Sequence, residues 1–335
     1  MSSTILGRFR QGIGIGVGLA VLVYVGYAVA VGADEVAGAL GAFAWEWLPV
    51  LLALSVVNYV IRYARWEYYL RVLDIRVPYK TSAGVFLAGL AMTITPGKVG
   101  EFLKSYLLKE SEGIPMARTA PVVFAERLSD LLALVLLAAL GAAEYGGPSA
   151  TPLLAAAGIA MASGVAVLQS QGLTNTVLGL LTRVPGVDRV VPKIREAVDA
   201  SRALLSLKPL LIGLLLSGIA WYAECAEYLL AFKGFGIDVD AGVAVFGYAF
   251  STVAGVVSPG GLGPTDIGLI EIAQRFTPAL QGQRDVATAA SFIVRFCTLW
   301  FAVILGALAL LRFRRFVEVD VDEARGAQDT PAPPR

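Results

Sequence analysis

The fold is decided by a short motif that occurs twice, as Thr95-Pro96-Gly97-Lys98-Val99-Gly100 and again as Ser258-Pro259-Gly260-Gly261-Leu262-Gly263. Both copies read hydroxyl residue, Pro, Gly, any residue, aliphatic residue, Gly. Each copy ends an apolar stretch, 81–95 or 241–257, that is shorter than the roughly 20 residues a spanning helix needs. Because proline disfavours a helical residue before it and glycine tolerates a positive φ, we expect each motif to break a helix. The expected structural breaks are Pro96, Gly97, Gly100, Pro259, Gly260, Gly261 and Gly263.

The composition is that of an integral membrane protein. Of the 335 residues, 57% are hydrophobic and only 16% are charged, whereas soluble domains are about 25% charged. Irregular backbone at membrane depth is tolerated only where protein covers it or water lines it, so the two short stretches are expected to be re-entrant hairpins. We predict an all-α, polytopic helix bundle whose six spanning helices cover 12–32, 47–71, 119–143, 151–168, 209–232 and 287–311.

The residue types present exclude several functions. The chain has no histidine, which removes His-based metal sites, most hydrolase triads and the zinc proteases. Its two cysteines, Cys225 and Cys297, both lie in apolar runs and form no disulfide framework or zinc motif. The net charge of +1 gives no indication of nucleic-acid binding. We expect no metal and no cofactor.

Lysine and arginine are distributed unevenly among the connecting segments. The basic-rich ones are the N-terminus, 71–80, 98–118, 183–208 and 312–315; the basic-poor ones are 33–46, 144–150 and 234–240. Only the re-entrant assignment of both short stretches places every basic segment on the cytoplasmic side, as the positive-inside rule requires. We therefore expect a multi-pass protein of the cell (plasma) membrane with both termini in the cytoplasm. The first apolar run is longer than the core of a signal peptide and is expected to remain uncleaved.

The two halves of the chain follow the same order of helix, short hairpin, Pro-Gly break and helix with an arginine. Glu67-Tyr68-Tyr69-Leu70 in the first half matches Glu227-Tyr228-Leu229-Leu230 in the second. With the hairpins entering from opposite sides, these would be inverted repeats, which commonly place a substrate site near the midplane. Chance similarity of two apolar halves is the alternative. We expect one membrane domain, 1–312, made of repeat 47–143, connector 169–208 and repeat 209–312, followed by a disordered tail at 317–335.

Ionisable residues within the apolar helices mark the candidate site, because each costs at least about 2.5–3.5 kcal/mol at bilayer depth. Arg127, flanked by Glu126 and Asp130, is suited to bind a lipid phosphate through its planar fork; an interfacial salt-bridge cluster is the alternative. Arg295 lies too deep to reach the interface easily. Its expected partners are Glu224, Glu227 or Glu271, and the first two are also candidates for a proton relay.

Lys98, Glu101 and Lys104 begin the segment after the first break, where exposed helix amides and a lysine would attract a phosphate. An ordinary Gly-Pro turn with charged interface residues is the alternative. Arg62 and Arg65, near the inner end of 47–71, are expected to be snorkelling anchors. The candidate substrate-binding residues are Lys98, Glu101, Lys104, Glu126, Arg127, Asp130, Glu224, Glu227, Asp266, Glu271 and Arg295.

Three stretches, 95–101, 126–130 and 258–263, resemble the transmembrane region of lysylphosphatidylglycerol synthases, whose free-standing relatives are called flippase-like membrane proteins. The resemblance covers about 10–312 and implies movement of a charged lipid between leaflets. In that family a separate soluble domain performs aminoacyl transfer, and we expect none here. The second motif continues as Pro264-Thr265-Asp266 instead of the usual charged ending, which puts the role of Asp266 in doubt. Some relatives are attached to glycosyltransferases of polyprenyl-linked sugars.

The favoured function is translocation of an anionic or phosphate-bearing lipid, such as a phospholipid or a polyprenyl-phosphate carrier. One alternative is an intramembrane lipid-modifying enzyme that uses Glu and Asp as acid and base. Another is a non-catalytic membrane subunit of a glycosyl or aminoacyl transferase system, docking through 169–208. The expected partners are a membrane lipid and either a transferase or a second copy of the chain, with no nucleic acid.

Overall fold

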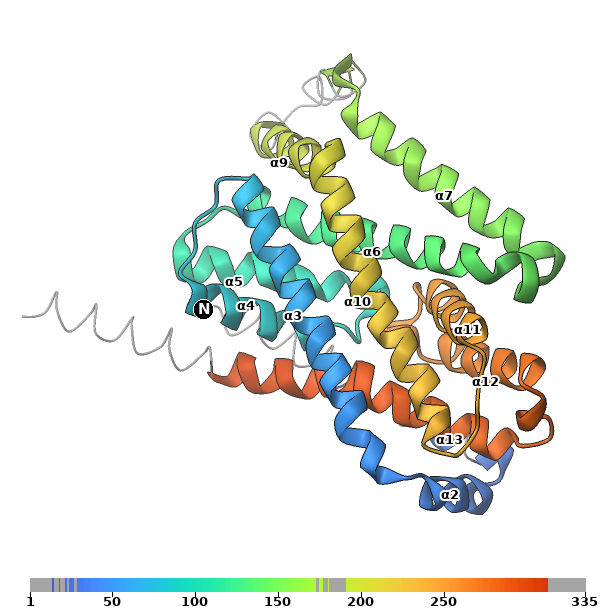
Figure 1. The fold of residues 1–335 in the computed structure, drawn as a ribbon. Coiled ribbons are helices and arrows are strands. Elements are labelled where there is room, and N and C mark those ends of the chain that lie inside the picture. The colour runs from blue at the N-terminus through green and yellow to red at the C-terminus, as the bar shows by residue number, and fades with distance from the viewer. Residues whose placement is uncertain are drawn as a thin grey trace, which may run out of the picture.

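The computed structural model describes residues 29–172 and 191–312, together with isolated positions at 14, 18, 22, 24–26, 175, 176 and 180. In these parts of the chain all regular structure is helical (Figure 1). The spanning helix predicted at 12–32 lies largely outside the described residues, and so do both termini and the predicted tail at 317–335.

The described elements of the first half begin with a helix in a segment where none was predicted. They are α2 (Ala33–Ala42), η1 (Trp45–Trp47), α3 (Leu48–Val72), α4 (Tyr79–Leu90), η2 (Pro96–Phe102), α5 (Leu103–Glu112), α6 (Met116–Tyr145) and α7 (Gly147–Gln169). Those of the second half are α9 (Val191–Leu204), α10 (Leu207–Lys233), α11 (Ala241–Ala254), η3 (Pro259–Gly261), α12 (Pro264–Phe276), η4 (Pro278–Leu280), α13 (Arg284–Arg295) and η5 (Phe296–Trp300). The last of these is a π-helical turn through which α13 continues to Arg312.

Four described helices are long and apolar enough to cross a membrane: Trp45–Val72, Ala150–Gln169, Leu207–Lys233 and Arg284–Arg312. The protein is therefore a multi-pass membrane protein. Helix α6, with 30 residues, is about 45 Å long at 1.5 Å per residue. It is not one of the four, and its first half contains Glu126, Arg127 and Asp130.

The centre of the molecule is a pair of long helices, α3 and α10, which pack side by side and run in opposite directions (Figure 1). Their close approach needs a glycine: a Cβ placed on Gly213 of α10 would lie 1.8 Å from the Tyr69 hydroxyl of α3. Helix α6 crosses behind this pair and packs against both α10 and α11. Helix α7 packs on α6 but leaves most of its surface outside the bundle.

Two helical hairpins flank the central pair, with α4 and α5 on one side and α11 and α12 on the other (Figure 1). The irregular turns at their tips, η2 and η3, contact each other. Gly260 at the second tip has a φ of 59°, and a Cβ there would lie 3.4 Å from the Cα of Ile94 at the first tip. Both the left-handed backbone and the close approach favour glycine at this position. The two motifs, far apart in the sequence, thus lie together near the centre of the fold.

Asp240 caps the N-terminus of α11, between the spanning helix α10 and the second hairpin. Its Oδ1 accepts hydrogen bonds from the amides of Gly242 at 2.7 Å and Val243 at 3.3 Å, and from the Tyr145 hydroxyl at 3.0 Å. These hydrogen bonds hold the pKa of Asp240 below its ordinary value. The bond from Tyr145 has the largest effect, and those from the two amides have smaller effects. The ionised cap therefore fixes the entry into the second hairpin.

Asp240→Ala is predicted to lower stability by about 1 kcal/mol at neutral pH, the typical effect of losing an N-cap. The contribution of a carboxylate with a lowered pKa is present above its unfolded pKa and is lost as pH falls through the folded value. The difference from wild type should therefore shrink in acid. Thermal unfolding in detergent at neutral and acidic pH measures this, with the exposed Asp238→Ala as control. Equal melting temperatures for all three proteins at neutral pH would contradict the cap.

Candidate functional site

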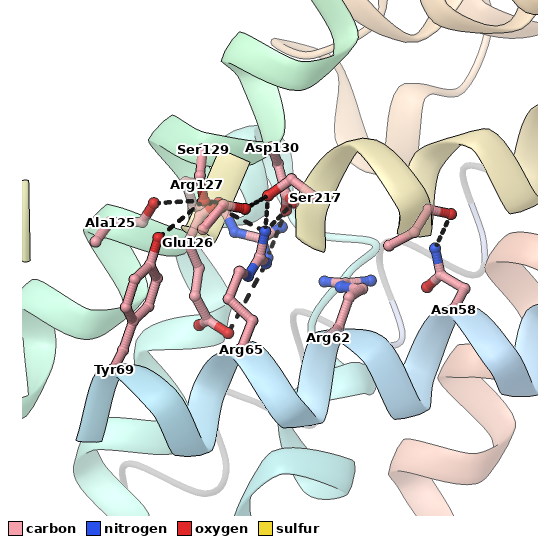
Figure 2. A network of polar contacts seen from close by, with 12 residues as sticks. Asn58, Arg62, Arg65, Tyr69, Ala125, Glu126, Arg127, Ser129, Asp130 and Ser217 are labelled. Carbon is pink, nitrogen blue, oxygen red and sulfur yellow. Dashed lines mark hydrogen bonds and ion pairs between the residues drawn. The ribbon is translucent and has the colours of Figure 1, made fainter. Parts of the chain in front are cut away.

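A cluster of charged side chains is enclosed where α3, the first break, α5 and α6 meet (Figure 2). It joins more cations than carboxylates and is held together by direct ion pairs. Its cations are Arg62, Arg65, Lys104 and Arg127, and its carboxylates are Glu101, Glu126 and Asp130.

Arg65 joins three helices at the centre of the cluster. Its Nη1 lies 2.5 Å from Oδ1 of Asp130 and also donates to Ser217 of α10, while Nη2 lies 3.9 Å from Oε1 of Glu126 (Figure 2). The prediction that Arg62 and Arg65 snorkel to the interface is wrong, because their exposed fractions are 5% and 0%. Glu101 of η2 pairs with Arg62 inside the bundle, and two carboxylates of α6 pair with Arg65, so both guanidinium groups are compensated away from the water interface.

Lys104 is enclosed rather than available to a ligand. Its Nζ lies 2.5 Å from Oε2 of Glu126 and 3.6 Å from Oε2 of Glu101, and 4.7 Å from the centre of the Trp66 ring. Two carboxylates and an aromatic face compensate a lysine that is removed from water. The structure therefore places Lys104 in the packing between α5 and α6 and not in an open phosphate cradle at a helix N-terminus.

Arg127 faces inward from α6 and is paired on two sides. Its Nη1 lies 3.2 Å from Oε1 of Glu101, and its Nη2 lies 2.9 Å from Oδ2 of Asp130. The same Glu101 oxygen is 3.7 Å from Nη2 of Arg62. Glu126, which flanks Arg127 in the sequence, instead accepts a hydrogen bond from Nζ of Lys104.

Arg295 is paired with Asp266, a residue whose role the sequence left in doubt. Its Nε lies 3.0 Å from Oδ1 of Asp266, and its Nη2 donates to the carbonyl of Gly260. The other carboxylate oxygen of Asp266 accepts from the amide of Gly263 at 2.9 Å and so caps α12. The predicted partners of Arg295 were Glu224, Glu227 and Glu271, and the structure brings none of them into an ion pair with it among the described residues. In both halves, an acidic residue just after the break binds the arginine of the following long helix.

A cavity of about 320 Å³ lies where the two hairpin tips meet. Its walls include Thr95 of the first break and Ser258 of the second. Charged side chains also reach it from both halves, with two more cations than carboxylates. They are Arg62, Lys98, Arg127, Arg295, Asp130 and Glu224.

Lys98 enters this cavity from a strained backbone. Its φ is 55°, a conformation that costs a residue other than glycine about 1–2 kcal/mol. Its Nζ lies 5.0 Å from the centre of the Trp221 ring. No carboxylate pairs with it among the described residues. A strained, unpaired lysine beside an aromatic ring is suited to bind an anion from the cavity.

Glu224 and Glu227 lie one turn apart on α10 and have neutral partners. Oε2 of Glu224 accepts from the Tyr248 hydroxyl at 2.7 Å, and Ser55 of α3 lies 3.1 Å from each oxygen of Glu227. Glu224 lines the cavity and Glu227 is fully buried behind it. Glu271 neither lines the cavity nor is buried. It is 51% exposed and pairs with Arg284 at 2.5 Å.

The structure thus sorts the predicted residues by position. Those that line the cavity are Lys98, Arg127, Asp130, Glu224 and Arg295; those that pair with lining residues or within the cluster are Glu101, Lys104, Glu126 and Asp266. Sequence reasoning missed Arg62 as a lining residue. A signal was present, because polar residues recur along α3 at the spacing of one helical face. They are Ser55, Asn58, Arg62, Arg65 and Tyr69, of which the last four are seen on one face of α3 in Figure 2.

These features define a class: a helical membrane protein with a charged cavity between two broken hairpins. The chain belongs to the family described as the lysylphosphatidylglycerol synthase TM region, whose model matches residues 12–306. It is also similar to "Glycosyltransferase AglD" of Haloferax volcanii, with 24% identity over 291 residues. That match covers 72% of this chain and 45% of the relative, so the chain spans less than half of the relative's length. Both similarities support a function related to membrane lipids.

Glu126→Gln is predicted to destabilise the protein by about 3–5 kcal/mol, because it leaves Lys104 and Arg65 buried with an incomplete set of partners. Glu126 does not line the cavity, so the effect should be on folding rather than on ligand contact. The measurement is thermal unfolding of the detergent-solubilised protein. Glu112→Gln, exposed at the end of α5, is the matched control and should leave the melting temperature unchanged. A stable Glu126→Gln protein would show that the cluster is not structural.

Proposed function

We propose that the protein moves an anionic or phosphate-bearing lipid, a phospholipid or a polyprenyl-phosphate carrier, between the leaflets of the cell membrane. The observation that carries this proposal is the cavity at the meeting point of the two hairpin tips, where cations outnumber carboxylates. A cavity with this charge balance favours an anion over a neutral or cationic ligand.

The headgroup phosphate is held by Arg127 and Lys98 in this proposal. Arg127 remains partly exposed, and its Nε has no hydrogen-bond partner among the described residues. Its planar fork matches a phosphate, while Lys98 adds a point charge. Arg62 and Arg295 complete the positive wall from the two halves.

The tails leave the cavity sideways into lipid. Phe124 of α6 and Val256 after α11 both line the cavity and are both 42% exposed. The apolar wall continues inward through Leu128 and Leu131 of α6. A polar chamber with an apolar rim suits a ligand with a charged head and hydrocarbon tails.

We further propose that α3–α6 and α10–α13 are inverted repeats, and that the six spanning helices are the run at 12–32, α3, α6, α7, α10 and α13. The hairpins α4–α5 and α11–α12 would then be re-entrant, with both chain termini in the cytoplasm. Supporting this are the repeated element order, the opposite directions of α3 and α10, and the matched pairs Glu101–Arg127 and Asp266–Arg295. Rocking of one repeat against the other would alternate access, with conformers separated by a few kcal/mol.

A transferase acting on the same lipid is the proposed partner, with a second copy of the chain as the other arrangement. The name of the Haloferax relative, a glycosyltransferase, supports the first choice. The connector between α7 and α10 contains the amphipathic, basic helix α9, which could receive such a partner at the cytoplasmic surface.

Arg127→Ala and Arg295→Ala are predicted to slow leaflet-to-leaflet movement of a fluorescent phosphatidylglycerol in proteoliposomes by at least about tenfold. A hydrogen bond to a charged group contributes about 1.5–3 kcal/mol, and 1.4 kcal/mol is a factor of ten. Arg127→Lys and Arg295→Lys, which keep the charge but lose the planar fork, should show an intermediate loss.

Arg284→Ala is the matched control, since Arg284 lies outside the cavity in an exposed pair with Glu271. Its rate should equal that of the wild type. Folding of each variant is checked by its melting temperature before transport is compared. Wild-type movement in folded Arg127→Ala and Arg295→Ala would rule out the assigned site, and no movement by the wild type would rule out translocation of this lipid.

A further inference from the structure

Glu224 and Glu227 differ from every other buried carboxylate in the described part of the chain, because neither has a cation within ion-pairing distance. Glu101, Glu126, Asp130 and Asp266 each have an arginine or lysine nitrogen within ion-pairing distance. Glu224 and Glu227 have none among the described residues, although their exposed fractions are only 6% and 0%. A buried carboxylate without a cation is strongly disfavoured in its charged form, so the pair needs another source of positive charge.

The hydrogen bonds around Glu227 point to a proton as that source. The Ser55 hydroxyl lies 3.1 Å from each Glu227 oxygen and 2.9 Å from the carbonyl oxygen of Cys297. A hydroxyl has one hydrogen to donate, so these three acceptors cannot all be satisfied by Ser55. If Glu227 is protonated, it donates to Ser55, and Ser55 donates to Cys297. One added proton therefore completes this set of contacts.

Glu224 connects this buried position with the cavity. It lines the cavity and lies three residues before Glu227, on the adjacent turn of the same face of α10. Its remaining contact, with the Tyr248 hydroxyl, is with a neutral donor. The ionisable or polar groups that face the two carboxylates from neighbouring elements are Ser55, Tyr59 and Arg62 of α3, Lys98 of η2, Asp130 of α6, Cys225 of α10, Tyr248 of α11 and Cys297 of η5.

We propose that Glu224 and Glu227 form a proton-binding site coupled to the cavity, so that the pair takes up a proton when an anionic headgroup enters and releases it when the headgroup leaves. The proton comes from water or buffer and forms an O–H bond on a carboxylate oxygen. No other bond changes. The coupling, but not the protonation itself, rests on the proposed lipid-binding function.

The coupling follows from shared electrostatics. Lys98 and Arg62 line the same cavity as Glu224 and act on its charge. A phosphate bound to these cations offsets their effect and places negative charge near Glu224, which favours its protonated form. By linkage, protonation of the pair strengthens binding of the anion by the same factor by which the bound anion strengthens binding of the proton. Above the pH at which the pair loses its proton, the affinity for an anionic headgroup falls by up to about tenfold per pH unit.

The test counts protons during lipid binding. Phosphatidylglycerol is titrated into the detergent-solubilised protein by calorimetry, in two buffers of different ionisation enthalpy. We expect uptake of about one proton per bound lipid in the wild type, as for a single coupled site. Glu224→Gln and Glu227→Gln, which imitate the neutral acid, should bind without proton uptake and with little dependence on pH. Glu271→Gln, on the exposed surface, should behave as the wild type.

Three results would overturn the proposal. These are lipid binding by the wild type without proton uptake, unchanged uptake in both Glu224→Gln and Glu227→Gln, and uptake lost equally in Glu271→Gln. If the variants do not fold, infrared spectra of the wild type in H2O and D2O, recorded with and without phosphatidylglycerol, provide the test. A protonated carboxyl band that grows at neutral pH when the lipid is added is expected, and its absence contradicts the site.

Failure of this inference is distinguishable from failure of translocation. Lipid movement in proteoliposomes without proton uptake removes the coupling and leaves the proposed function intact. A protonated carboxyl band in a protein that moves no lipid removes the proposed function and leaves the proton site intact.

Discussion

The pairing of buried charges is the constraint on which the rest of the structure depends. A bilayer core and a packed helix interior offer no water to an arginine or a carboxylate, so each charge must meet an opposite charge or lose its own. Arg65 of α3, fully buried, meets this requirement by contacting Asp130 and Glu126 of α6 and Ser217 of α10, and so joins three helices. The helices are therefore held in one relative arrangement by polar contacts as well as by packing.

The same constraint explains why the two breaks carry the site. Each motif ends a helix before the chain has crossed the fold, and an acidic residue just beyond it reaches the arginine of the next long helix. Glu101–Arg127 and Asp266–Arg295 are these pairs, and they bring the two tips to either side of one cavity. Glycine permits the approach, since Gly260 has a left-handed backbone directly against Ile94.

The sequence predicted the helical class, the family and most helix positions, because these depend on local apolar runs and motifs. Helix α3, for example, covers Leu48–Val72 where 47–71 was predicted. It did not predict which charge pairs with which, because that choice is made in three dimensions. Glu224, Glu227 and Glu271 were the predicted partners of Arg295. The structure pairs Arg295 with Asp266 instead. Arg62 and Arg65 were misassigned to the interface because their position near a helix end outweighed the polar stripe to which they belong.

The central claim is that the cavity between the hairpin tips holds an anionic lipid headgroup through Lys98 and Arg127. Native mass spectrometry of the protein exchanged into an equimolar mixture of phosphatidylglycerol and phosphatidylcholine tests it most directly. The wild type is predicted to retain phosphatidylglycerol preferentially, and a folded double variant, Lys98→Ala with Arg127→Ala, is predicted to lose that preference. Equal retention of both lipids by the wild type, or an unchanged preference in the double variant, would contradict it.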